Sequence, residues 1–163
     1  MSGLLSGIVA IYLFISLEAY LLGVTLLVIS GLIDRYDGKF ARKYGLENEF
    51  GRTLDSFNDL ISFVVAPIIL IYQTALLPNT TLCMIGTIVF ISAAVFRLAR
   101  FSLNDDPTIV SGLPTTVSGL TLALLVLGCY FIEGHLILKE WGLFGLLLVL
   151  SGMMVTSFKM NKG

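Results

Sequence analysis

Long apolar runs separated by short polar breaks organise the whole chain. Because a helix needs about 20 mostly apolar residues to cross the ~30 Å hydrocarbon core of a bilayer, runs of this order predict membrane-spanning helices. Six such runs are present, at residues 3–17, 19–33, 54–72, 82–98, 113–132 and 141–158. The second and third reach full length only by continuing into charged sequence around Asp34 and Asp55. We therefore expect an all-α integral membrane fold with six transmembrane helices, in a single domain that covers residues 1–163.

Composition supports lipid as the solvent and argues against several classes of protein. Hydrophobic residues make up 56% of the 163 residues, which exceeds the roughly half that soluble domains contain. The net charge is only -1 and no basic run is present, so we expect no nucleic-acid partner. Cys83 and Cys129 both lie inside apolar runs, and we interpret them as packing residues.

Basic residues are distributed unevenly among the breaks between the runs. Most lie between the second and third runs, at the end of the fourth run and near the C-terminus: Arg35, Lys39, Arg42, Lys43, Arg52, Arg97, Arg100, Lys159 and Lys162. The positive-inside tendency therefore predicts that these segments, and both termini, face the cytoplasm at the cell membrane. Pro67 and Pro114 are expected to bend or begin helices.

Four aspartates flank the break between the second and third runs. At helical spacing, acidic and small residues form two stripes: Asp34, Asp37, Gly38 and Ala41 on one helix, and Gly51, Asp55 and Asp59 on the other. If the stripes face each other, four carboxylates converge at the cytoplasmic ends of helices 2 and 3.

Clustered carboxylates in a membrane protein require a cation. Each one costs about 2.5–3.5 kcal/mol deep in a span, so four approach ~10 kcal/mol before mutual repulsion is counted. Since only oxygen ligands are near, the site favours Mg²⁺ or Mn²⁺, and four carboxylates suit two divalent ions that assist phosphoryl transfer. Gly38 and Gly51 would let a nucleotide or diphosphate approach the backbone, and the Arg42 guanidinium could bind two of its oxygens.

Other interpretations fit parts of this pattern. A single aspartate or arginine near a helix end is equally well explained by an interfacial salt bridge, and small residues also let membrane helices pack closely. Arg97 and Arg100 could be positive-inside anchors or an anion pocket. A divalent-cation channel or carrier would also carry acidic residues on its helices. Against that function, the carboxylates cluster at one membrane face, together with Arg42 and Arg52.

The stretch from residue 34 to 59 resembles the signature of the CDP-alcohol phosphotransferases. It reads Asp, two residues, Asp-Gly, two residues, Ala-Arg, eight residues, Gly, three residues, Asp, three residues, Asp, and every fixed position matches. The resemblance implies that Asp34, Asp37 and Asp55 ligate the metal ions, while Asp59 both ligates and acts as the general base. It also implies a CDP pocket lined by Gly38, Ala41 and Arg42, beside Gly51, and a homodimer.

Further segments are similar to the phosphatidylserine synthase branch of that family. They are residues 54–63 with the following Ala66-Pro67, residues 96–101 and residues 112–114. This similarity implies that L-serine attacks the lipid-side phosphorus of a CDP-linked lipid, with diacylglycerol or archaeol tails, and that CMP leaves. From their position at the same membrane face, Arg97, Arg100 or both would then bind the serine carboxylate. Glycerol 3-phosphate, inositol phosphate and an amino alcohol remain alternative acceptors.

Overall fold

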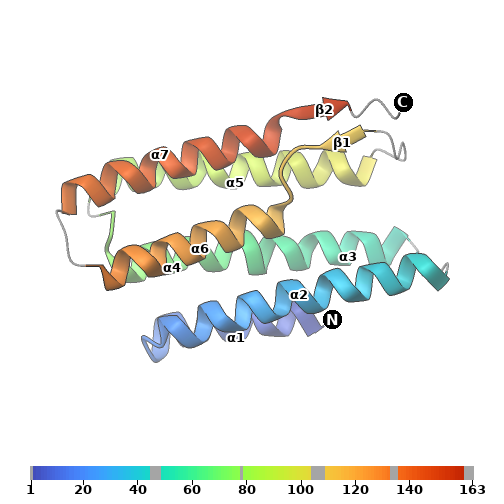
Figure 1. The fold of residues 1–163 in the computed structure, drawn as a ribbon, viewed down its shortest axis with the longest axis horizontal. Coiled ribbons are helices and arrows are strands. Elements are labelled where there is room, and N and C mark those ends of the chain that lie inside the picture. The colour runs from blue at the N-terminus through green and yellow to red at the C-terminus, as the bar shows by residue number, and fades with distance from the viewer. Residues whose placement is uncertain (1, 45–48, 78, 104–108, 133–135, 160–163) are drawn as a thin grey trace.

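The computed structural model describes residues 2–44, 49–77, 79–103, 109–132 and 136–159, and these residues form an elongated bundle of helices (Figure 1). The elements in chain order are α1 (Ser2–Ser16), α2 (Tyr20–Tyr44), α3 (Glu49–Leu60), η1 (Ile61–Val65), α4 (Ala66–Thr74), α5 (Thr80–Leu103), β1 (Ile109–Ser111), α6 (Thr115–Phe131), α7 (Leu136–Val155) and β2 (Ser157–Lys159). Because α3, η1 and α4 follow one another without a break, the described helices match the six apolar runs. The prediction of a helix at each run is therefore confirmed.

The second and third helices extend into charged sequence, as expected. Helix α2 continues past Asp34 to Tyr44, and α3 begins at Glu49, before Asp55. The turn between α1 and α2 includes Glu18, which has a positive φ of 50°. Since that backbone conformation is uncommon outside glycine, it ends the first helix sharply and lets α2 run back along α1.

One stretch of the third predicted helix is π-helical, which the apolar pattern did not predict. Residues Ile61–Val65 form η1, and the N–H of Ala66 bonds to the carbonyl of Ile61, five residues earlier. Pro67 follows directly and has no N–H to donate, and its ring would clash with the carbonyl four residues before it in a regular α-helix. The expectation that Pro67 distorts its helix is consistent with this wider turn.

The described residues are overwhelmingly helical, as the all-α expectation required, and two three-residue strands are the one addition to it. Strand β1 pairs antiparallel with β2, so that Val110 lies opposite Phe158. The sixth apolar run was predicted to stay helical to residue 158, but α7 ends at Val155. The N–H of Leu113 also donates to the carbonyl of Met153 at 3.0 Å. Backbone pairing with the segment before α6 therefore replaces the last helical turn.

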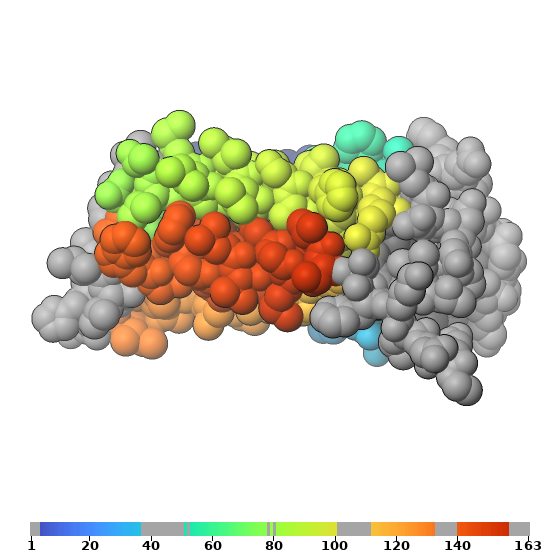
Figure 2. Space-filling model, turned by 90° about the horizontal axis from the view of Figure 1, so that it is seen from above, coloured from blue at the N-terminus to red at the C-terminus, as the bar shows by residue number. Residues whose placement is uncertain are grey.

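The helices lie nearly parallel in layers that bring distant segments together (Figure 1). Helix α1 packs on α2 and α4, α6 packs on α2, α4 and η1, and α5 packs along α7. Figure 2 shows α5 and α7 side by side along one face. The end of α2, the start of α3, the end of α5 and the β1–β2 pair all lie at one end of the bundle.

The outer surface is apolar, as expected for helices in contact with lipid. Large side chains with at least half of their surface exposed include Ile8, Leu22, Ile88 and Val149. Within the described residues, two helical stretches are long and apolar enough to cross a bilayer, Thr53–Thr74 and Thr81–Arg100. The apolar helices Leu4–Ser16, Thr115–Phe131 and Glu140–Val155 are shorter. The structure thus contains membrane-capable helices, and six full spans remain a prediction.

Candidate functional site

Helices α2 and α3 meet through a polar contact at Asp34. The amide of Asn58, which is buried, donates from Nδ2 to Asp34 Oδ1 at 3.4 Å. The side-chain oxygen Oδ1 of Asn58 in turn accepts a hydrogen bond from Ser62 Oγ, also at 3.4 Å. Asp34 of the first predicted stripe therefore lies against α3, beside the turn that carries Asp59. The sequence-based prediction did not include Asn58 in the site. Its position between Asp55 and Asp59 is the signal that could have identified it.

Of the two aspartates in the second stripe, Asp59 is more buried than Asp55. Asp55 lies one helical turn earlier on α3, and its side chain is exposed, whereas the Asp59 side chain is partly buried. Oxygen Oδ2 of Asp59 accepts a hydrogen bond from the hydroxyl of Thr115 at 3.1 Å. Oxygen Oδ1 is buried and has no hydrogen-bond partner among the residues that the structure describes. A buried carboxylate oxygen without a donor is the kind of group that a metal ion or substrate proton would satisfy.

Arg97 approaches the same carboxylate from α5. Its Nη1 donates to Thr115 Oγ1 at 3.0 Å, so the threonine hydroxyl lies between the guanidinium and Asp59. Arg100, one turn further along α5, donates from Nη1 to the carbonyl of Val155 at 3.4 Å, next to the strand pair. The structure thus brings Arg97 to Asp59, while the described contact of Arg100 is with the end of α7.

Close packing of α6 on η1 holds Thr115 in this position. Gly119 lies one turn after Thr115 and is buried against the backbone of Phe63. A Cβ atom at Gly119 would lie 2.6 Å from the Phe63 carbonyl carbon, so only glycine permits this approach. Pro114 precedes α6 as its N-cap, which confirms that this proline begins a helix.

Several predicted site residues lie partly or wholly outside this geometry. The side chains of Asp37, Gly38, Ala41 and Arg42 fall outside the described part of the structure, although the backbone of all four belongs to α2. Gly51 is exposed in the first turn of α3. Of the expected convergence of four carboxylates, the described residues therefore show one part, the contact of Asp34 with α3.

The donor set fits hard divalent cations, although the described side chains alone do not complete a site. Asp34, Asp55 and Asp59 offer only carboxylate oxygens, which suit Mg²⁺ or Mn²⁺. Among the side chains described, no three acidic, histidine or cysteine groups lie close enough to hold a metal ion together. The fourth predicted ligand, Asp37, is outside that set. Oδ1 of Asp59, which is buried and has no partner among the described residues, is open either to a bound cation or to the proton of an acceptor.

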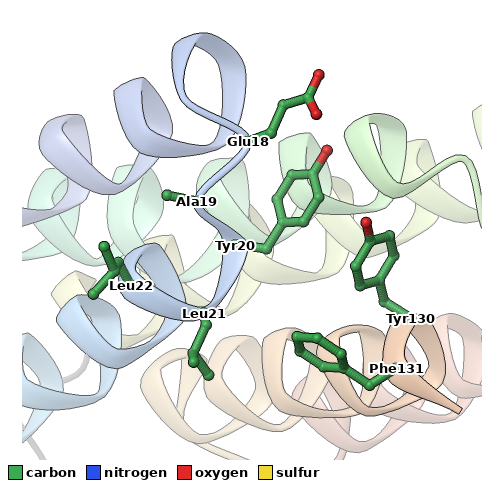
Figure 3. Close-up of a pocket in the computed structure, with 7 residues that line it drawn as sticks. All are labelled: Glu18, Ala19, Tyr20, Leu21, Leu22, Tyr130 and Phe131. Carbon is green, nitrogen blue, oxygen red and sulfur yellow. The ribbon is translucent and has the colours of Figure 1, made fainter.

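An open pocket lies at the opposite end of the bundle (Figure 3). It is lined by the turn between α1 and α2 and by the end of α6, including Glu18, Tyr20, Tyr130 and Phe131. The rings of Tyr20 and Tyr130 meet edge to face, with centroids 5.1 Å apart. Aromatic side chains of this kind are typical of a membrane interface. Asp34 lies further along α2, and Thr115 begins α6 at its other end, so this pocket is separate from the candidate site.

Comparison with known proteins identifies a family whose profile matches nearly the whole chain. The profile of the family described as CDP-alcohol phosphatidyltransferase matches residues 1–157. The chain is 37% identical over 113 residues to a CDP-diacylglycerol–serine O-phosphatidyltransferase of Methanocaldococcus jannaschii, covering 69% of this chain and 53% of the relative. Identity is 33% over 103 residues to the enzyme of that name from Bacillus subtilis, covering 61% of this chain and 58% of the relative.

A third relative is named for an archaetidyl lipid, where the first two are named for diacylglycerol. The archaetidylserine synthase of Methanothermobacter thermautotrophicus is 35% identical over 111 residues, which cover 66% of this chain and 47% of the relative. The chain thus spans about half the length of the curated relatives that it matches.

Proposed function

Because the chain belongs to the CDP-alcohol phosphatidyltransferase family, we propose that it transfers the lipid phosphoryl group of a CDP-linked lipid to L-serine and releases CMP. Two of the three relatives are named CDP-diacylglycerol–serine O-phosphatidyltransferase and the third archaetidylserine synthase, and the serine in all three names supports serine as the acceptor. The donor is then CDP-diacylglycerol or CDP-archaeol, which differ only in tails that would lie in the bilayer.

The observation that carries the proposal is the polar contact of three helices around Asp59. Its carboxylate lies on α3 one turn from Asp55, with Arg97 of α5 held next to it through Thr115 of α6. A base and a fixed cation so close together suit an acceptor that carries both a hydroxyl and a carboxylate. A phosphorylated acceptor such as glycerol 3-phosphate would require more positive charge around the acceptor.

The residues take the following roles in this proposal. Asp34, Asp37, Asp55 and Asp59 would hold two divalent ions, and Gly38, Ala41, Arg42 and Gly51 would line the CDP pocket. When bound, Mg²⁺ or Mn²⁺ would neutralise charge on the diphosphate of the donor. Asp59 accepts the proton of the serine hydroxyl as the hydroxyl oxygen bonds to the lipid-side phosphorus. The bond from that phosphorus to the CMP oxygen breaks, and Arg97 and Arg100 bind the serine carboxylate.

The proposal includes a placement in the membrane. The chain is one domain of six spans in the cell membrane, with the aspartates at the cytoplasmic ends of helices 2 and 3, and it acts as a homodimer. Basic residues around Asp34 and at the end of α5 support this orientation.

CMP release by the purified protein tests the function. The protein is supplied with CDP-diacylglycerol, Mg²⁺ or Mn²⁺, and either L-serine, glycerol 3-phosphate, inositol phosphate or no acceptor. We expect release that depends on serine and is lost in Asp59→Asn, but is kept in the control Glu18→Gln, which changes an exposed acid at the other end of the bundle.

Each other outcome has a defined meaning. Release driven by another acceptor would keep the chemistry and replace the substrate. No release by folded, metal-loaded protein would contradict the transferase function, and nucleotide-independent metal flux in proteoliposomes would then favour a divalent-cation transporter.

A further inference from the structure

Thr115 makes two hydrogen bonds whose direction can be assigned from chemistry alone. Its side chain is fully buried at the first position of α6. A guanidinium has no acceptor, so Arg97 Nη1 must donate to Thr115 Oγ1, at 3.0 Å. A hydroxyl has one proton, and Asp59 Oδ2 lies 3.1 Å away to accept it. The order of donation is therefore Arg97 to Thr115 to Asp59.

This arrangement holds one oxygen of Asp59 and leaves the other available. The carboxylate torsion of an aspartate is broad, so a hydrogen bond to one oxygen is needed to fix where the other one points. Thr115 occupies Oδ2, while Oδ1 is buried and has no partner within the described residues. The same holds at Arg97, whose Nε is buried and without a partner in that part of the chain. Each of the two charged groups thus has a buried hydrogen-bonding atom without a partner among the described residues.

We propose that Thr115 is a positioning residue that links proton removal to acceptor binding, an inference that rests on the proposed serine transfer. Its hydroxyl orients Asp59 so that Oδ1 faces the acceptor hydroxyl, and it holds Arg97 so that the guanidinium meets the acceptor carboxylate. Hydrogen bonds in such a chain strengthen one another in a low-dielectric site, so loss of the middle hydroxyl weakens both ends.

The geometry also limits the class of acceptor. Asp59 and Arg97 are bridged by a single hydroxyl, so the groups that they bind on a substrate must also be close together. A short β-hydroxy acid such as serine has its hydroxyl and carboxylate two carbons apart. Homoserine, with one more carbon, and ethanolamine, without a carboxylate, are expected to react at least tenfold more slowly in kcat/KM.

Two substitutions at Thr115 separate positioning from packing because the two roles predict opposite orders of activity. Thr115→Val keeps the shape and removes the hydroxyl, whereas Thr115→Ser keeps the hydroxyl and removes a methyl group. We expect Thr115→Val to lower kcat at least tenfold and to raise the KM for serine at least threefold, while Thr115→Ser stays within threefold of the unchanged protein. The matched control is Thr87→Val, because Thr87 is also a buried threonine, and its hydroxyl hydrogen-bonds to the backbone carbonyls of Cys83 and Met84 on its own helix.

A measurement without metal or substrate checks the contact itself. Thermal unfolding of the metal-free protein is compared for Thr115→Val, Arg97→Met and the double variant. If Arg97 donates to Thr115, the two shifts in unfolding temperature are not additive. Additive shifts would remove the structural basis of the inference.

The kinetic outcomes distinguish this inference from the proposed function. If the unchanged protein shows no CMP release that depends on serine, the function fails and the inference fails with it. If it does, but Thr115→Val matches it or Thr115→Ser is no better than Thr115→Val, only the inference is overturned. Should Thr115→Val not fold, Thr115→Cys takes its place, since a thiol is a much weaker hydrogen-bond donor than a hydroxyl. Equal kcat for Thr115→Cys and Thr115→Ser would then overturn it.

Discussion

Replacing Gly119 by alanine tests the packing that places α6 over the candidate site. An added Cβ would overlap the carbonyl oxygen of Phe63, and it would lie 2.6 Å from the carbonyl carbon and 2.7 Å from the Phe63 Cα. Carbon atoms in contact prefer about 3.5–4.0 Å, so α6 and η1 would have to separate by roughly 1 Å. The obstacle is backbone, and no side-chain rotation can relieve it.

The expected loss in stability follows from two opposing effects. Overpacking of a well-packed contact costs about 1–3 kcal/mol, and a clash with backbone belongs at the upper end of that range. Alanine returns up to ~1 kcal/mol because it is a better helix former than glycine. We therefore expect Gly119→Ala to lower the free energy of unfolding by ~2 kcal/mol.

Gly128→Ala is the matched control, because Gly128 lies on the same helix with nothing within 4 Å of its added Cβ. It should gain up to ~1 kcal/mol from helix propensity, so the two variants should differ by ~3 kcal/mol. The assay is SDS-induced unfolding in mixed micelles, followed by circular dichroism. CMP release should also fall in Gly119→Ala, since Thr115 lies one turn away on the same face of α6. Equal stability of the two variants would refute the close contact between α6 and η1.

Three further predictions concern the charged and polar groups of the site. Chelation of divalent ions should abolish CMP release, and Mg²⁺ or Mn²⁺ should restore it; full activity after chelation would contradict the metal site. Arg97→Ala should raise the KM for serine at least tenfold, and Arg100→Ala should have a smaller effect, because Arg97 is linked to Asp59 through Thr115, whereas the described hydrogen bond of Arg100 goes to the carbonyl of Val155. If neither variant changes this KM, the assignment of both arginines to the acceptor is wrong. Asn58→Ala should lower the free energy of unfolding by about 1–2 kcal/mol, because it removes the hydrogen bonds to Asp34 and Ser62, and unchanged stability in the SDS assay would argue against this link between α2 and α3.

Local patterns were sufficient to predict the helices and the spacing of the acidic residues. The apolar runs gave the helices because burial and lipid contact favour continuous apolar segments. The one-turn spacing of Asp55 and Asp59 depends only on helical geometry, and both lie on α3. The continuation of α2 past Asp34 was likewise predictable. Its apolar run is too short to span a bilayer, so the helix must continue into the charged residues that follow.

Other features depend on contacts between segments far apart in the chain. Strand β1 forms because residues 109–111 lie beside residues 157–159, and the intrinsic pattern of either segment did not predict a strand. The π-helical η1 was signalled in part by Pro67, but its partner Gly119 was not recognisable from the sequence.

The sequence by itself determined the helical segments, their apolar character and the family signature with its aspartates, because each of these is set by neighbouring residues. Only the tertiary structure decided which groups meet Asp59. Thr115 is 56 positions away, and Arg97 is 18 positions from Thr115. Neither pairing repeats at a helical period. The packing of α6 on η1 selected them, because a partly buried carboxylate and a partly buried guanidinium require partners wherever the folded helices supply them.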